Sequence, residues 1–156
     1  MRSLIVAVAA VAIPSAALAQ NSVSLESKVY VARSITDASG KKSNQLFDPD
    51  KTPVLPGEPL VVMINYKNNG ARPATAFVIN NPIPAAVTFT GVEQAWAVVS
   101  VDNGKSFGPL ATLKVLAGNG ATRPANPADV TAVRWTFAQP IAPAAGGRVS
   151  FYGIVK

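Results

Sequence analysis

Short runs in which apolar and polar residues alternate dominate the chain between residues 54 and 90. One face of the run 60–67 carries Leu60, Val62, Ile64 and Tyr66. The opposite face carries Val61 and Met63 and turns polar only at Asn65 and Lys67. A period of two is typical of a β-strand, and a strand apolar on both faces is covered on both. The pattern therefore predicts a central strand.

Turn-forming residues bound this strand on both sides. Pro56-Gly57 suits a type II turn, because proline fixes φ and glycine accepts the positive φ that follows. Asn68-Asn69-Gly70 predicts a tight hairpin leading to a second strand over 74–80. That strand is expected to stop at Asn81-Pro82-Ile83-Pro84, which lacks two amide donors.

Before this region, residues 22–34 are predicted to form a first strand with a change of face or a bulge near Ser27-Lys28, where the alternation is interrupted. Residues 35–53 are mostly turn formers, and only Leu46 and Phe47 are suited to hold them against a core. A loop near twenty residues long is uncommon in a compact domain and is typically functional or mobile.

Further short strands are expected toward the C-terminus. Asp102-Asn103-Gly104 predicts a hairpin between residues 94–101 and 105–109. Residues 111–116 form a short strand with no evident partner, and residues 118–128 a loop. Two alternating strands follow, over 130–137 and 148–156.

The pattern as a whole predicts an all-β fold of seven to nine short strands. No segment after residue 19 keeps a helical apolar stripe over three turns, and thirteen prolines and eleven glycines punctuate the chain. This spacing favours an antiparallel β-sandwich over a barrel. The predicted core residues are Leu60, Val62, Ile64, Tyr66, Val78, Val87, Phe89, Trp96, Val133, Trp135, Phe137, Val149 and Phe151.

The region 54–156 resembles the conserved-repeat domain, a family of unknown function in bacterial and archaeal surface proteins. The matching positions are Pro56, Gly57, Tyr66, Asn68, Gly70, Ala76, Pro84, Val87 and Phe89. The resemblance implies an immunoglobulin-like sandwich that serves as a structural or adhesive module without catalysis. The spacing before Pro56 is longer than is typical of the family, which leaves open whether residues 22–34 pair within their own chain or with a neighbour.

Residues 1–19 have the pattern of a signal peptide. Arg2 precedes an apolar run from Leu4 to Ile13, and Ala17-Leu18-Ala19 is a small-residue cleavage site before Gln20. The expected organisation is a signal peptide (1–19), the first strand with its long polar loop (20–53), and the remainder of one sandwich domain (54–156). The product is expected in the periplasm, at the cell surface or outside the cell, with no membrane span in the mature chain.

The formal charge is +6, and cleavage would lower it to +5 by removing Arg2. Basic residues are dispersed, whereas nucleic-acid-binding domains usually concentrate them on one face, so no nucleic-acid partner is predicted. The excess either attracts anionic envelope polymers or only aids solubility. The chain has no cysteine, so no disulfide contributes to its stability.

No catalytic, cofactor-binding or metal-binding residue is predicted, and we expect no enzyme and no cofactor. The chain has no histidine, which removes the Ser-His-Asp and Cys-His nucleophile systems. Asp48 and Asp50 form the one acidic cluster that a Ca²⁺ ion could use, but Pro49 between them and Lys51 beside them favour a simple turn.

These patterns lead to two hypotheses of function. The first is an exported structural or adhesive module, including a subunit that forms a homo-oligomer or filament by exchanging the strand 22–34 with a neighbour. The second is a β-sandwich that binds a glycan or envelope polymer through exposed aromatic side chains. The candidates for such a platform are Tyr30, Trp96, Trp135 and Tyr152.

Overall fold

A computed structural model of the chain describes residues 23–118 and 120–156. The signal peptide predicted for residues 1–19 lies outside the described residues. No helix among those described is long and apolar enough to cross a lipid bilayer.

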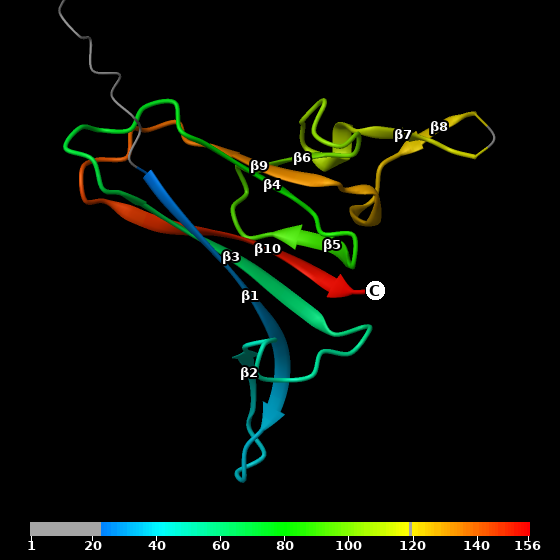
Figure 1. The fold of residues 1–156 in the computed structure, drawn as a ribbon. Helices are drawn as coiled ribbons and strands as arrows, with labels where there is room; N and C mark the ends of the chain where they lie inside the picture. The colour runs from blue at the N-terminus through cyan, green and yellow to red at the C-terminus, as the bar shows by residue number, and fades with distance from the viewer. Residues whose placement is uncertain (1–22, 119) are drawn as a thin grey trace, which may run out of the picture.

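Two antiparallel sheets pack face to face (Figure 1), which confirms the predicted all-β, sandwich-like architecture. The larger sheet has the order β2-β1-β3-β10-β5 and the smaller one β4-β9-β6. The strands of the larger sheet are β1 (Val23–Thr36), β2 (Lys42–Phe47), β3 (Pro59–Asn68), β5 (Val87–Val92) and β10 (Gly146–Val155). Those of the smaller sheet are β4 (Val78–Pro82), β6 (Val98–Ser100) and β9 (Ala132–Thr136).

A third pair of strands, β7 (Lys114–Leu116) and β8 (Thr122–Pro124), forms a hairpin outside the two sheets. Two 3₁₀ turns, η1 (Leu110–Thr112) and η2 (Pro127–Asp129), flank it. The partner of the strand predicted over 111–116 is thus β8, which lies in the predicted loop 118–128. With this hairpin the described residues contain ten strands, more than the seven to nine predicted.

β3 is central, as predicted, because β1 and β10 pair with its two edges. The turn before it also matches the prediction. Gly57 has a φ of +88°, and the Glu58 amide donates to the Leu55 carbonyl over 3.2 Å. Pro56 and Gly57 therefore occupy the central positions of a turn that needs a positive φ at its second central residue.

The tight hairpin predicted at Asn68–Gly70 is wrong, because the chain crosses here to the other sheet. Asn68 is buried, and its Nδ2 donates to the carbonyls of Arg72 and Ile141 over 2.8 Å each. Its Oδ1 accepts the Gly70 amide over 2.9 Å. The asparagine holds a crossover loop in place of a hairpin turn. The second strand consequently starts at Val78, not at Ala74.

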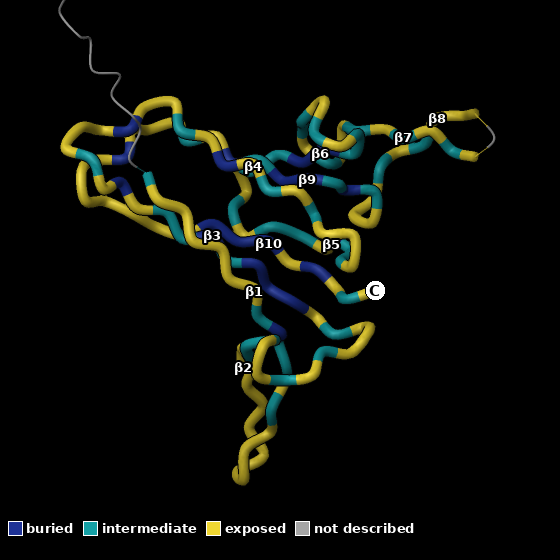
Figure 2. The backbone as a smooth tube through the Cα atoms, viewed as in Figure 1, coloured by how far each residue is buried: buried dark blue, intermediate teal, exposed yellow. Residues whose placement is uncertain are grey.

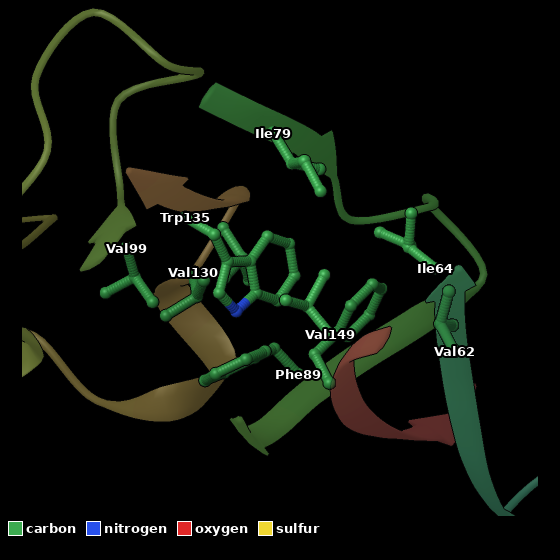
Figure 3. Packing of buried hydrophobic residues seen from close by; sticks show 10 residues of the cluster. Val62, Ile64, Ile79, Phe89, Val99, Val130, Trp135 and Val149 are labelled. Carbon is green, nitrogen blue, oxygen red and sulfur yellow. The ribbon is translucent and has the colours of Figure 1, made fainter. Parts of the chain in front are cut away.

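Trp135 and Phe151 lie fully buried between the sheets, in the cluster shown in part in Figure 3. Of the thirteen predicted core residues, eight are buried: Leu60, Val62, Ile64, Phe89, Val133, Trp135, Val149 and Phe151. Tyr66, Val87 and Phe137 are partly buried.

Two core predictions are wrong. Trp96 is 48% exposed, because only Val98–Ser100 of the predicted strand 94–101 is extended and Trp96 lies in the turn before it. Val78 is 40% exposed, because its neighbour Ile79 is the residue of β4 that points inward.

Candidate functional site: the free edge of the larger sheet

β1 pairs within its own chain in this structure. It is antiparallel to β3 from Val23 opposite Asn68 to Val31 opposite Leu60. The predicted change of face or bulge near Ser27-Lys28 is wrong, since the pairing there is continuous. Ser27 lies on the same face as Val29, so the interruption in the apolar pattern is a polar residue on an unbroken strand.

The loop predicted over 35–53 contains a strand of its own, β2, which forms a hairpin with β1. The turn of this hairpin is closed by Asp37, whose Oδ1 accepts the amides of Ser39 (2.9 Å) and Lys41 (3.0 Å). These hydrogen bonds lower the pKa of the Asp37 carboxyl, the largest effect being that of the Ser39 side chain. A charged side chain that satisfies the turn amides stabilises the reversal of the chain.

β2 covers only half of β1. Its pairing runs from Val31 opposite Phe47 to Thr36 opposite Lys42 and ends there. Residues 23–30 therefore have β3 on one side and no strand among the described residues on the other (Figure 1). Such an edge presents a row of backbone donors and acceptors to solvent.

The same half of β1 also extends beyond the smaller sheet. Opposed residues of antiparallel strands project to the same side, so Val29, opposite Val62, and Leu25, opposite Tyr66, face the interior side of the larger sheet. Yet Leu25 is 52% and Val29 40% exposed, because the three-stranded sheet does not reach over them. Figure 2 shows this strand largely as an exposed segment beside the buried stretch of β3.

An ion pair fastens the other half of β1 to the loop that leads from β2 to β3. The Arg33 guanidinium donates from Nε to Glu58 Oε1 over 2.7 Å and from Nη2 to Oε2 over 3.1 Å. It also donates to the Pro53 carbonyl over 2.7 Å. The pKa of Glu58 is lowered, chiefly by Arg33 and then by the amide of Leu55. Bidentate contacts of this kind fix geometry as well as charge.

A groove of about 410 Å³ lies beside the free edge, between Ser27–Tyr30 and the turn Asp48–Asp50. Lys28 Nζ lies 3.0 Å from Glu26 Oε1 on the strand, and the hydrogen bond that Lys28 donates to Glu26 is the main reason that the pKa of Lys28 is raised. The edge thus carries one charge of each sign.

The acidic residues beside the groove have the arrangement of a turn. Asp48 Oδ1 accepts the Asp50 amide over 3.0 Å, and the Asp48 carbonyl accepts the Lys51 amide over 3.1 Å. Within residues 23–118 and 120–156, no three histidine, cysteine or acidic side chains lie close enough to hold a metal ion. The geometry matches the local role that the sequence favours for this pair.

The four aromatic residues of the predicted platform do not form one surface. Trp135 is buried in the core, and Trp96 packs edge-on against Phe137 with 5.2 Å between ring centroids. Tyr30 and Tyr152 both lie opposite Val61, one on each side, on the outer face of the larger sheet. Only these two tyrosines share a surface.

No protein-family model, curated protein or solved structure matches this chain. The resemblance to the conserved-repeat domain therefore stays a prediction based on the nine positions given above.

Sequence reasoning identified the segment 22–34 but missed what makes it available. The two halves of this segment differ in their contacts. Among the described strands, residues 23–30 pair only with β3, whereas Val31, Arg33 and Phe47 join β1 to β2 and to the loop that follows β2. Because residues 42–45 are all polar, β2 lacks the apolar alternation by which strands are recognised.

Proposed function

We propose that this protein is an exported, non-enzymatic structural module that joins a surface or extracellular assembly through the free edge of its larger sheet. The observation that carries the proposal is the unpaired edge of β1 at residues 23–30, together with the exposed Leu25 and Val29 beside it. An added strand would satisfy the edge amides and carbonyls and place its own side chains beside these apolar residues.

The geometry favours addition of a strand over exchange of the whole segment 22–34. Exchange would break nine residue pairs between β1 and β3, the pairing with β2 and the Arg33–Glu58 contact. Addition leaves all of these interactions in place and needs no unfolding. The resemblance of residues 54–156 to a domain of surface proteins and the signal-peptide pattern of residues 1–19 support a location outside the cytoplasm.

The location and the assembled state can be tested together in the cells that make the protein. N-terminal sequencing and fractionation are expected to find a chain beginning at Gln20 in the periplasmic, surface or released fraction. Immunogold electron microscopy is expected to place it in assemblies larger than a monomer. Full-length monomer confined to the cytoplasm would refute the proposal.

A second candidate function is glycan binding on the outer face of the larger sheet. Tyr152 is 38% exposed and borders a groove of about 450 Å³ that Leu46 and Ile154 also line. A tyrosine ring beside an apolar groove suits stacking against a sugar face. Titration with envelope oligosaccharides should shift NMR signals of Tyr152 and its neighbours, and Tyr152→Ala should abolish the shifts. Unchanged spectra at millimolar oligosaccharide would exclude this function.

A further inference from the structure

We infer that the partner of the free edge is a second copy of this chain, bound antiparallel along residues 24–30 about a twofold axis at Ser27. This inference rests on the proposed function and names its partner. The two larger sheets would join into one continuous sheet across the axis.

The length of the pairing is set by β2. Val31 is already opposite Phe47, so an incoming strand can extend along the edge only as far as Tyr30, in the groove between Ser27–Tyr30 and the turn Asp48–Asp50. By symmetry the incoming strand pairs over the same residues, which gives a seven-residue ladder from Ser24 to Tyr30. Seven residues is within the usual length of a β-strand.

The charges on the edge select one register. With the axis at Ser27, Glu26 of each chain lies opposite Lys28 of the other, and two opposite-charge pairs form. Moving the axis by one residue places Glu26 opposite Glu26, or Lys28 opposite Lys28. Opposite charges directly across a pair of strands stabilise it and like charges destabilise it. Both neighbouring twofold registers are therefore disfavoured.

The apolar residues agree with the same register. Leu25 of each copy lies opposite Val29 of the other, on the interior side of the sheet that the three-stranded sheet leaves uncovered. Pairing would bring these apolar side chains of the two copies into contact and reduce their exposure to water. A contact between identical patches related by a twofold axis closes on itself, so this edge yields a dimer.

Charge reversal tests the register directly on the mature protein. Glu26→Lys and Lys28→Glu each place two like-charged pairs across the axis, so each variant alone should dimerise at least about tenfold more weakly than the native chain. An equimolar mixture of the two should recover native affinity as a heterodimer, because each Lys–Lys edge then faces a Glu–Glu edge. Sedimentation equilibrium up to about 1 mM measures all three, since weak association at this scale is detectable there.

The mixture separates contacts between chains from contacts within one chain. The intrachain Glu26–Lys28 ion pair is broken in both variants and is not restored by mixing. Lys105→Glu, at an exposed site in the turn before η1, changes net charge as Lys28→Glu does and should leave dimerisation unchanged. Thermal unfolding of each variant at low concentration checks that the monomer stays folded.

Three results would overturn the inference: native protein that remains monomeric at about 1 mM, single variants that dimerise as well as the native chain, or a mixture that does not recover. Association that is unchanged by these charge reversals would indicate exchange of the first strand or a different surface. Those results concern the partner and register alone, because export and assembly in cells are measured separately by the fractionation above.

Discussion

The side-chain oxygen of Gln94 accepts a hydrogen bond from the indole Nε1 of Trp135 over 3.2 Å. The same oxygen accepts the backbone amide of Ser150 over 3.0 Å. Trp135 lies in the smaller sheet and Ser150 in the larger. Gln94, in the segment between β5 and β6, therefore connects the two sheets beside the indole nitrogen of Trp135.

Replacement of Gln94 with Met keeps the approximate shape of the side chain but removes the acceptor. Two buried donors would then lose their partner, and the free energy of unfolding should fall by about 1–3 kcal/mol. Gln94→Glu retains an acceptor oxygen and should lose less. Urea unfolding followed by tryptophan fluorescence measures both, and equal losses in the two variants would contradict the bridging role.

Replacing each of two buried serines with alanine should have opposite effects on stability. Ser100 Oγ donates to Asp102 Oδ1 over 2.7 Å and accepts the amides of Asp102 and Gly104. Ser150 Oγ has no hydrogen-bond partner among the residues that the structure describes. Ser100→Ala should therefore destabilise by about 1–3 kcal/mol, whereas Ser150→Ala should be neutral or stabilising, because it removes an unsatisfied polar atom. Chemical denaturation of the two variants provides the comparison, and a larger loss at Ser150 would refute the assignment.

Substitutions at Phe151 and Trp96, two aromatic residues predicted as core, should lower the free energy of unfolding by different amounts. Phe151→Ala removes a fully buried ring and should cost about 3–5 kcal/mol. Trp96→Phe, at a half-exposed site, should cost less than about 1 kcal/mol. The emission of the Trp96→Phe variant then comes from Trp135 alone and should be blue-shifted relative to the native chain. A red-shifted residual emission would show that Trp135 is not buried.

Acid stability should depend on Asp129. Arg123 donates to both carboxylate oxygens over 2.6 Å, and with the Asn126 amide it lowers the Asp129 pKa to about 2. A carboxyl whose pKa is lower in the folded state than in the unfolded state stabilises the fold at pH values above the unfolded-state pKa, which is near 3.9. This stabilisation is lost as the pH falls through the folded-state pKa. The stability advantage of the native chain over Asp129→Asn should therefore be constant above about pH 5 and shrink between about pH 4 and pH 2. Urea midpoints across this range test it, and a difference that grows on acidification has the wrong sign.

The sequence predicted the interior of the sandwich well because burial on both faces leaves a clear pattern. β3 and β9 were recognised by alternating or continuous apolar residues that lie against the opposite sheet. The Pro56-Gly57 turn was recognised because its positive φ requires a residue such as glycine.

The errors arose where tertiary contacts determine local structure. Asn68 carries a strong hairpin signal, yet its side-chain amide is buried in a crossover loop. One of the carbonyls to which this amide donates is that of Ile141, 73 residues further along the chain. β2 is polar because the layer above does not cover it, so no apolar alternation marked it as a strand. The free edge depends on where β2 ends and on the width of the smaller sheet, and neither property is encoded within residues 23–30 themselves.

Hydrogen exchange at residues 23–30, followed by NMR at two protein concentrations, tests the central claim most directly. In dilute protein, the amides of this segment that face β3 should be protected, and the alternate amides that face outward should exchange rapidly. At a concentration where the chain associates, the outward amides should gain protection while those of residues 42–47 stay unchanged. Outward amides that are already protected in dilute protein, or that stay unprotected in the associated form, would contradict a free edge that serves as the assembly surface.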